Sequence, residues 1–247
     1  MTTLVLALVA GAVIGLALGG LGGGGSVLAV PALVYLLGFT PAEATTASLV
    51  IVTLTSVTAL SGHARDGNVV WRTGLLFAAA GVLPAMLAGV AAGHLPQAVL
   101  TIAFSVIAAL AAVRMLRPAR TGPTGPVSAG RAGAAGAGLG AVTGFLGVGG
   151  GFLAVPALVG VVKLPMRRAV GTSLLVITIN SLAALGARAG TGTHLDWAVI
   201  APFTAAAVLG AWDGKRLSHK LKGGTLQRVF AYVLLAVAVF MLVDALL

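Results

Sequence analysis

Long apolar segments separated by short polar stretches follow one another along the whole chain. Apolar and polar residues do not keep a period of two, so these segments predict helices and not β-strands. Most segments have the roughly 20 residues that a helix needs to cross a bilayer. Two shorter segments have a reach of roughly 20 Å, which predicts steep half-crossings or arms of a re-entrant hairpin. The short segments are 25–37 and 150–162, and the others are 2–20, 43–62, 71–92, 97–116, 132–146, 168–187, 195–213 and 225–247.

The composition supports this interpretation. Of the 247 residues, 59% are hydrophobic and only 8% are charged, whereas a soluble domain carries about a quarter charged residues. So few charges cannot cover a water-facing surface, which excludes an ordinary soluble enzyme and a disordered chain. The net charge is +10, but the basic residues interrupt apolar segments instead of forming a solvated face, so no nucleic-acid partner is expected. We predict an all-α integral membrane protein with the lipid bilayer as its solvent.

Residue types that carry catalysis or bind metals are scarce. The chain has no cysteine, which excludes disulfides, thiol catalysis and thiolate metal sites. The four histidines lie near the ends of apolar segments and lack His-x-x-x-His spacing,. We therefore expect no catalytic residue, no metal site, no cofactor and no enzymatic activity. His63, Arg65 and Asp66 are expected in a solvated turn, with guidance of an anion by His63 or Arg65 as the alternative.

An internal repeat organises the chain. The heptapeptide Leu28–Val34 recurs unchanged as Leu153–Val159, 125 residues later. Each copy is expected to contain a glycine-interrupted helix pair and three spanning helices. The predicted units are a first membrane repeat (1–116), a linker rich in proline and arginine (117–131) and a second membrane repeat (132–247). Glycines recur with the same offset, since Gly11, Gly15, Gly19, Gly22, Gly24 and Gly25 correspond to Gly136, Gly140, Gly144, Gly147, Gly149 and Gly150.

The basic residues predict how the two copies are oriented. If each pair of short arms returns the chain to the side it came from, 14 basic residues fall on one side and only Arg188 on the other. If each pair makes one crossing instead, the division is 7 against 8. Lysine and arginine prefer cytoplasmic loops, so the first arrangement is favoured. It predicts inverted-topology repeats, a cytoplasmic 117–131 linker and both termini outside the cytoplasm.

Two glycine clusters are the first candidate for binding chemistry. Glycine lets other groups approach the backbone closely, and irregular backbone at membrane depth requires a protein or water surrounding. A helix that begins at such a turn directs free N–H groups and a positive dipole end toward a cavity, which suits an anion. Tight helix packing or a simple hairpin turn is the alternative interpretation. The residues are Gly22, Gly23, Gly24, Gly25 and Ser26 in the first copy, and Gly147, Gly149, Gly150 and Gly151 in the second.

Hydroxyl-bearing helix faces follow each glycine cluster. Ser48, Thr55 and Ser56 correspond to Ser173, Asn180 and Ser181, and residues seven or eight apart share a helix face. Uncharged donors of this kind can solvate an oxyanion. Interhelical hydrogen bonds, or bonds back to carbonyls of the same helix, are the alternative. The candidate ligands are Thr46, Ser48, Thr55, Thr172, Ser173 and Asn180, so the predicted site contains no charged residue.

A third glycine pattern favours packing over binding. Gly11, Gly15 and Gly19, and their counterparts Gly136, Gly140 and Gly144, recur every four residues and line one helix face. Small faces let membrane helices approach closely. We expect these faces to pack within the chain or at a homodimer interface.

The combined motifs resemble the sulfite exporter TauE/SafE family of membrane transporters. They are the glycine turn followed by Val-Pro-x-Leu, the Ala-x-x-x-Ser-Leu helix start at Ala44–Leu49 and Ala169–Leu174, and the Gly-x-x-x-Trp re-entry at Gly67–Trp71. The second re-entry, Gly192–Trp197, is one residue longer. The resemblance covers nearly the whole chain and implies export of a small sulfur-containing oxyanion across the bacterial inner membrane.

The function expected from these features is secondary transport of a small anion by alternating access, most simply export of sulfite or a related oxyanion or organosulfonate. A proton or a sodium ion remains open as the coupling ion. An anion channel with the same lining is one alternative, and a membrane scaffold subunit without transport is another.

Overall fold

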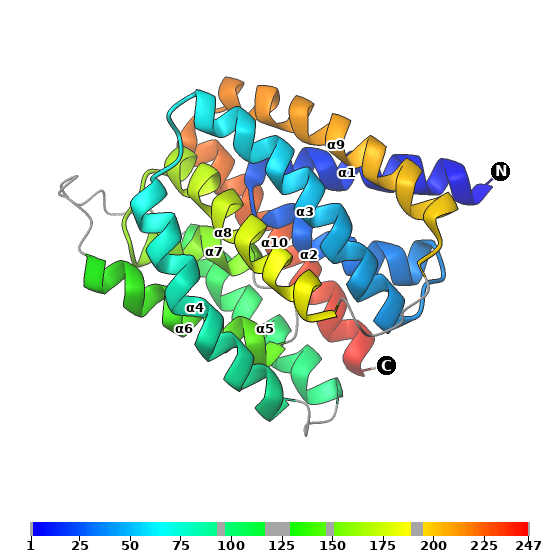
Figure 1. Ribbon diagram of the computed structural model, residues 1–247, viewed down its shortest axis with the longest axis horizontal. Coiled ribbons are helices and arrows are strands. Elements are labelled where there is room, and N and C mark those ends of the chain that lie inside the picture. The colour runs from blue at the N-terminus through cyan, green and yellow to red at the C-terminus, as the bar shows by residue number, and fades with distance from the viewer. Residues whose placement is uncertain (1, 93–96, 117–128, 147–150, 189–194, 247) are drawn as a thin grey trace.

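The computed structural model describes residues 2–92, 97–116, 129–146, 151–188 and 195–246. This part of the chain is helical and contains no strand. The helices lie side by side in one assembly in which helices of one copy pack against helices of the other (Figure 1). They are α1 (Thr2–Leu21), α2 (Gly24–Pro31), the π-helical η1 (Ala32–Leu36), α3 (Pro41–Arg65), α4 (Trp71–Ala92), α5 (Gln97–Leu116), α6 (Ala129–Leu146), α7 (Gly151–Gly160), α8 (Met166–Arg188), α9 (Trp197–Lys220) and α10 (Gly223–Leu246).

The helices follow the apolar segments closely, with two differences. Helix α9 extends to Lys220, beyond the predicted end at 213, and α6 begins at Ala129, inside the predicted linker. An apolar segment read from the sequence ends at the first charged residues. The helix itself can continue through them, because its backbone hydrogen bonds do not depend on apolar side chains. Basic side chains are stabilised near a helix C-terminus, where α9 has His219 and Lys220,.

The expectation of a membrane protein is confirmed. In the described part of the chain, seven helices are long and apolar enough to cross a membrane. Large apolar side chains such as Leu83, Leu87 and Leu209 are about two-thirds exposed on the outside of the helix assembly, as expected for a surface that faces lipid. The candidate spans are Thr3–Leu21, Ala42–Arg65, Trp71–Ala88, Val99–Leu116, Met166–Gly186, Trp197–Lys220 and Gly223–Ala245.

The glycine faces bring α1 against α9 and α6 against α4. A methyl group on Gly11, Gly15 or Gly19 would lie 2.3, 2.0 or 2.0 Å from a carbonyl oxygen of α9. The oxygens belong to Phe203, Ala207 and Ala211 in the same order, so the two helices are parallel. Equivalent glycines of α6 repeat this packing, with Gly136 against Phe77 and Gly140 against Gly81. Packing within the chain is therefore confirmed for these faces, and each helix pair combines the two copies.

Equivalent helices of the two copies cross at the centre, where α3 packs against α8 (Figure 1). Arg188 contacts Thr46, and Thr178 contacts Ser56. Residue numbers fall on α8 as they rise on α3, so the two helices are antiparallel. Helices α5 and α10, which are also equivalent, pack together.

The first glycine turn forms a hairpin with unequal arms. Helix α1 reaches His63 in the last turn of α3, through the carbonyl of Gly19. The chain then reverses, and η1 ends with Tyr35 hydrogen-bonded to Asp244 in the last turns of α10. The short arm formed by α2 and η1 thus returns the chain toward the level of the α10 C-terminus.

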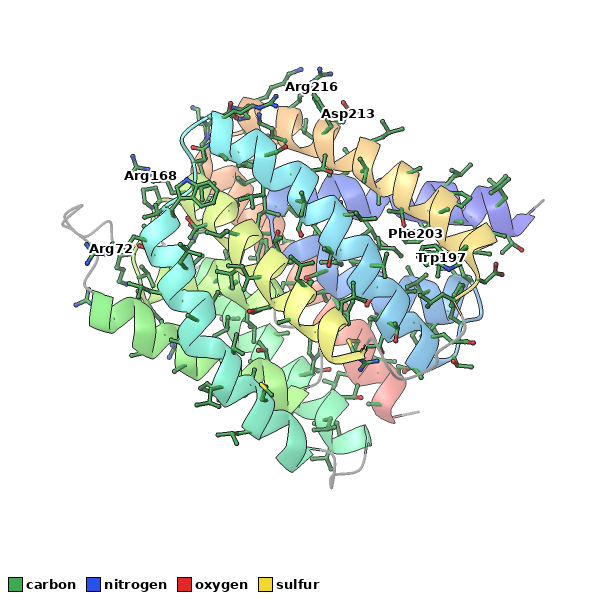
Figure 2. All side chains as sticks on the ribbon, in the orientation of Figure 1. Arg72, Arg168, Trp197, Phe203, Asp213 and Arg216 are labelled. Carbon is green, nitrogen blue, oxygen red and sulfur yellow. The ribbon has the colours of Figure 1, made fainter. Side chains whose placement is uncertain are left out.

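Charged side chains divide the molecule into two ends. The basic end contains the C-termini of α3 and α9 and the N-termini of α4, α6, α8 and α10 (Figure 1). Arg72, Arg168 and Arg216 lie along it, and Trp197 lies at the opposite, acidic end (Figure 2). The acidic end contains Glu43, Asp196 and Asp244, with Arg188 as its one described basic residue. The described basic residues of the basic end are Arg65, Arg72, Arg114, Arg131, Lys163, Arg167, Arg168, Lys215, Arg216, Lys220, Lys222 and Arg228.

Candidate functional site

The first glycine turn sits against the second copy. Gly22 has a φ of +73°, which L-residues with side chains rarely adopt,. Its N–H donates to the Leu18 carbonyl at 2.9 Å. A methyl group on Gly22 would lie 2.6 Å from the Ser173 hydroxyl oxygen and 3.3 Å from Val155. The structure therefore brings together two predicted site residues, Gly22 and Ser173, that are far apart in the sequence.

Gly25 and Ser26, in the same segment, make contacts within the hairpin formed by α1 and α2. Gly25 has no space for a side chain, because a methyl group would lie 2.4 Å from the Leu18 Cβ. Ser26 donates its hydroxyl to the Gly23 carbonyl at 2.7 Å. No side chain caps the N-terminus of α2, which begins at Gly24. The observed contacts of Gly25 and Ser26 are therefore those expected for tight helix packing in a hairpin turn, the alternative to anion binding.

The second glycine cluster falls largely outside the described residues. Gly147, Gly149 and Gly150 are not described, and Gly151 is the first residue of α7.

A buried polar centre lies where α3 crosses α8. The hydroxyl oxygens of Ser56 and Thr178 are 3.0 Å apart, and both residues are buried. Thr55 and Ser181 are also buried, at 1% and 2% exposure. The Asn180 Oδ1 atom is buried and has no hydrogen-bond partner among the described residues. An unsatisfied buried amide oxygen is costly, so Asn180, two residues after Thr178 on α8, has unused hydrogen-bond acceptor capacity.

The remaining hydroxyls mostly bond to their own helices. Thr46, Thr55 and Ser173 donate to the carbonyls of Ala42, Ile51 and Val170. Ser48 donates to Thr45 in the same way, and Thr172 accepts from the Val70 N–H at 3.1 Å. Hydrogen bonds to carbonyls of the same helix are the alternative to anion binding that the sequence left open for these faces. A hydroxyl rotates readily about its C–O bond, so these donors can be redirected toward a ligand.

Arg188 is a charged residue beside a candidate ligand, and the sequence analysis did not include it among the candidates. Its Nη1 donates to the Thr46 hydroxyl at 3.3 Å, near the acidic end of the α3–α8 crossing. A positive charge therefore lies beside the candidate ligand Thr46. The signal was present in the sequence, because Arg188 is the one basic residue that the charge count leaves on the other side.

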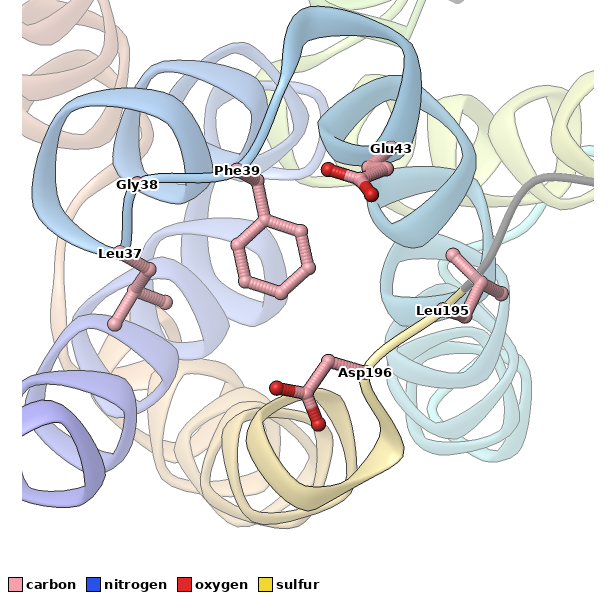
Figure 3. Close-up of a pocket in the computed structure, with 6 residues that line it drawn as sticks. All are labelled: Leu37, Gly38, Phe39, Glu43, Leu195 and Asp196. Carbon is pink, nitrogen blue, oxygen red and sulfur yellow. The ribbon is translucent and has the colours of Figure 1, made fainter.

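A cavity of about 410 Å³ opens at the acidic end. Figure 3 shows the Phe39 ring between the carboxylates of Glu43 and Asp196. Both carboxylates also stabilise helix starts, since Glu43 bonds to the Thr40 N–H and Asp196 accepts from the Ala198 N–H, each at 3.0 Å. Thr46, which contacts Arg188, lies about one helical turn beyond Glu43 on α3. The cavity is lined by Leu37, Gly38, Phe39, Glu43, Leu195 and Asp196.

The equivalent turn at the basic end carries the opposite charge. Lys163 corresponds to Gly38, and Arg168 corresponds to Glu43, both with the offset of 125. The two turns share one backbone shape, since φ is +63° at Lys163 and +72° at Gly38. Arg167 donates to the carbonyls of His219 and Leu221 and so closes the C-terminus of α9.

The sequence-based expectation for His63 is corrected by the structure. His63 is only 2% exposed and lies in the last turn of α3 instead of a solvated turn. Arg65 and Asp66 are exposed as expected. Asp66 is 2.8 Å from both the Lys215 Nζ and the His219 Nε2. The hydrogen bond from the Lys215 ammonium holds the pKa of the Asp66 carboxyl below its usual range.

Comparison with known proteins identifies relatives over the full length. A "Probable membrane transporter protein" of Xylella fastidiosa (strain 9a5c) is 34% identical, covering 97% of this chain and 95% of the relative. Its counterpart in strain Temecula1 is 32% identical with the same coverage. The "Probable membrane transporter protein YunE" of Bacillus subtilis is 30% identical over 40% of this chain and 36% of its own length. No solved structure matches the chain.

The family comparison agrees with the architecture. The family model described as "Sulfite exporter TauE/SafE" matches residues 7–241, which include both glycine clusters and the α3–α8 crossing. They also include two charged mouths, which we define as the turn with Lys163 and Arg168 at the basic end and the cavity beside Glu43 and Asp196 at the acidic end. The helical membrane fold and the full-length relatives support the same assignment. The chain thus belongs to the sulfite exporter TauE/SafE family of membrane transporters.

Proposed function

We propose that this protein is a secondary transporter that exports sulfite, or a related sulfur-containing oxyanion or organosulfonate, by alternating access. The family description supports the sulfite class, and the printed names of the relatives support transport. The observation that carries the proposal is the buried polar centre at the antiparallel α3–α8 crossing, with the unpartnered Asn180 Oδ1.

The proposed ligands are the neutral groups of this centre and the two glycine turns. Hydroxyl donors that leave their back-bonds, together with the Asn180 amide nitrogen and backbone N–H groups, would solvate the oxygens of an anion. Asn180 must then turn its amide nitrogen to the ligand, and its Oδ1 is free to accept from a bound hydrogen-oxyanion or water. Neutral ligation favours release as well as binding, because it lacks a strong fixed counter-charge.

The proposed topology consists of inverted repeats with the basic end in the cytoplasm. The antiparallel α3–α8 pair and the concentration of described arginines and lysines at one end support it,. The 117–131 linker is then cytoplasmic, and both termini lie outside the cytoplasm at the bacterial inner membrane.

The charges of the two equivalent turns favour export. Lys163 and Arg168 at the basic end attract an anion, whereas Glu43 and Asp196 at the acidic end repel it,. An anion is therefore concentrated at the cytoplasmic mouth and disfavoured at the outer mouth after release. Arg188, one turn beyond the outer mouth, would stabilise the anion during its passage outward.

The mixed helix pairs are the proposed moving parts. Helices α1 and α9, like α4 and α6, meet backbone to backbone at their glycines, which leaves no room for a side chain at these contacts. Each pair is expected to move as a rigid body about the α3–α8 crossing, which alternately opens the two ends.

Counterflow in proteoliposomes tests the proposal. Vesicles loaded with unlabelled sulfite should transiently accumulate labelled sulfite against its gradient, because a carrier exchanges substrate across the membrane. A channel would dissipate the gradient without accumulation, and a scaffold would give no flux. Asn180→Leu should abolish counterflow and thermal stabilisation by sulfite, while Thr58→Val on the outer face of α3 should retain both,. Retention of both by Asn180→Leu would reject the central site.

A further inference from the structure

The buried histidine at the basic end has no role in the proposed anion site. The His63 Nε2 lies 3.1 Å from the Gly19 carbonyl oxygen, so the Nε2–H donates to the end of α1. The Nδ1 atom is buried and has no partner among the described residues. The imidazole is thus held with one nitrogen used and one available at the junction of α1, α3 and α9.

Charged and titratable residues of α9 and of the α3 C-terminus surround this ring. On α3 they are Arg65 and Asp66, and on α9 they are Lys215 and His219; α1 has no titratable side chain. Asp66 is the one acceptor among them, and both Lys215 and His219 already contact it at 2.8 Å. The His63 and His219 rings are stacked with their centroids 6.4 Å apart.

Protonation is therefore incompatible with the observed arrangement. A proton on Nδ1 would create a donor with no acceptor and a buried cation beside Lys215, and both are unfavourable. Water reaching the ring would remove both penalties. The protonated ring thus requires a conformation in which the end of α1, together with α9, separates from α3.

The same separation affects the anion site. Gly19 is three residues before Gly22, which rests on Ser173 of the second copy. Movement of the α1 end away from His63 consequently carries the glycine turn with it. It opens the basic end and alters the contact between the turn and α8.

We propose that His63 is a proton-binding site whose occupancy selects the conformation open at the basic end. The proton comes from water at that end, binds Nδ1 when the junction opens, and returns to water before the junction closes. This proposal rests on the alternating-access function proposed above. By linkage, acid shifts the population toward the open form, and any ligand that closes the junction releases the proton.

A cysteine-accessibility experiment tests the site without measuring transport. The chain has no native cysteine, so a single reporter has no background. Ser218→Cys places a thiol on the buried face of α9 at this junction, and Thr225→Cys places one at the exposed start of α10. The ratio of their maleimide-labelling rates cancels the pH dependence of the thiol chemistry.

We expect this ratio to rise as pH falls from 8 to 5.5, with a limit of about tenfold per pH unit for one proton. His63→Gln can still donate to Gly19 and should make the ratio independent of pH. His219→Gln, which changes the exposed histidine, should retain the response. A response that survives His63→Gln, disappears in His219→Gln, or is absent from the wild-type background would overturn the proposal.

A second variant keeps the test decisive if His63→Gln does not fold. Lys215→Gln removes the cation next to the ring and one of the two close partners of the Asp66 carboxylate, so protonation should become easier and the midpoint should move to higher pH. An unchanged or lower midpoint would contradict the proposal. Counterflow at pH 8 is measured in parallel, so failure of the proton site and failure of the transport function give different results.

Discussion

The hydroxyl oxygens of Ser56 and Thr178 lie 3.0 Å apart at the point where α3 crosses α8. The two residues belong to different copies and do not occupy equivalent positions, since Ser56 corresponds to Ser181 and Thr178 to Thr53. This polar contact joins the two copies inside an apolar assembly, two residues before Asn180, whose buried Oδ1 atom has no partner among the described residues.

This contact predicts a measurable coupling between the copies. In a double-mutant cycle with Ser56→Ala and Thr178→Val, we expect about 0.6 kcal/mol of coupling, the average for such bonds in membrane proteins. Reversible unfolding in detergent provides the measurement. Thr58→Val, which loses only a bond within α3, should show no coupling to Thr178→Val. Equal coupling for both pairs would contradict the assignment.

Gly15 should be intolerant of any side chain. The methyl group of Gly15→Ala would meet the Ala207 carbonyl oxygen at 2.0 Å, and backbone must shift to relieve the clash. We expect the free energy of unfolding to fall by about 1–3 kcal/mol, the usual cost of overpacking. Gly138→Ala on α6 meets nothing within 4 Å and should be neutral or slightly stabilising. Similar melting temperatures for the two variants would refute the tight α1–α9 interface.

Lys163 should be strained where its counterpart Gly38 is not. A left-handed backbone costs a residue with a side chain about 1 kcal/mol, and glycine avoids this cost. Lys163→Gly should therefore raise the free energy of unfolding by about this amount, and Gly38→Ala should lower it similarly, because no atom lies near Gly38. Lys163→Gln, which keeps the strain, serves as control and should leave the stability unchanged. A change of the same sign in Lys163→Gly and Gly38→Ala would show that φ is not the cause.

The basic mouth should affect transport through long-range electrostatics. Lys163→Gln combined with Arg168→Gln should slow export at low ionic strength, because the mouth no longer concentrates the anion. The difference should disappear near 1 M salt, where the screening length is about 3 Å. Initial export rates at several salt concentrations give the comparison, with Arg131→Gln at the start of α6 as control. A defect independent of salt would point to a structural effect instead.

Arg188 should contribute directly to anion affinity. Arg188→Gln keeps a donor for Thr46 but loses the charge, and we expect the Kd for sulfite to rise about tenfold, which corresponds to about 1.4 kcal/mol. Arg72→Gln removes a charge at the opposite end and should leave the affinity unchanged. Calorimetric titration of purified protein measures both. An unchanged Kd in Arg188→Gln would remove Arg188 from the site.

The sequence by itself determined the helices, the repeat and the distribution of charge. Segments of about 20 apolar residues form helices because the bilayer leaves the backbone no other partner. The offset of 125 that relates Leu28–Val34 to Leu153–Val159 also relates Gly15 to Gly140 in the observed packing. The predicted anion ligands Gly22 and Ser173 were likewise found in contact.

The tertiary structure alone decided which faces meet. A glycine face predicts that another helix approaches closely, but it does not predict which one. In the structure, Gly15 packs against Ala207 of the second copy. The burial of His63 and the contact of Arg188 with Thr46 depend on helices more than 40 residues away in the chain. Local sequence encodes the apolar length and the small face of each helix. The identity of its neighbour is settled only when all the helices pack together, because many faces in this chain of alanine, glycine, valine and leucine are alike.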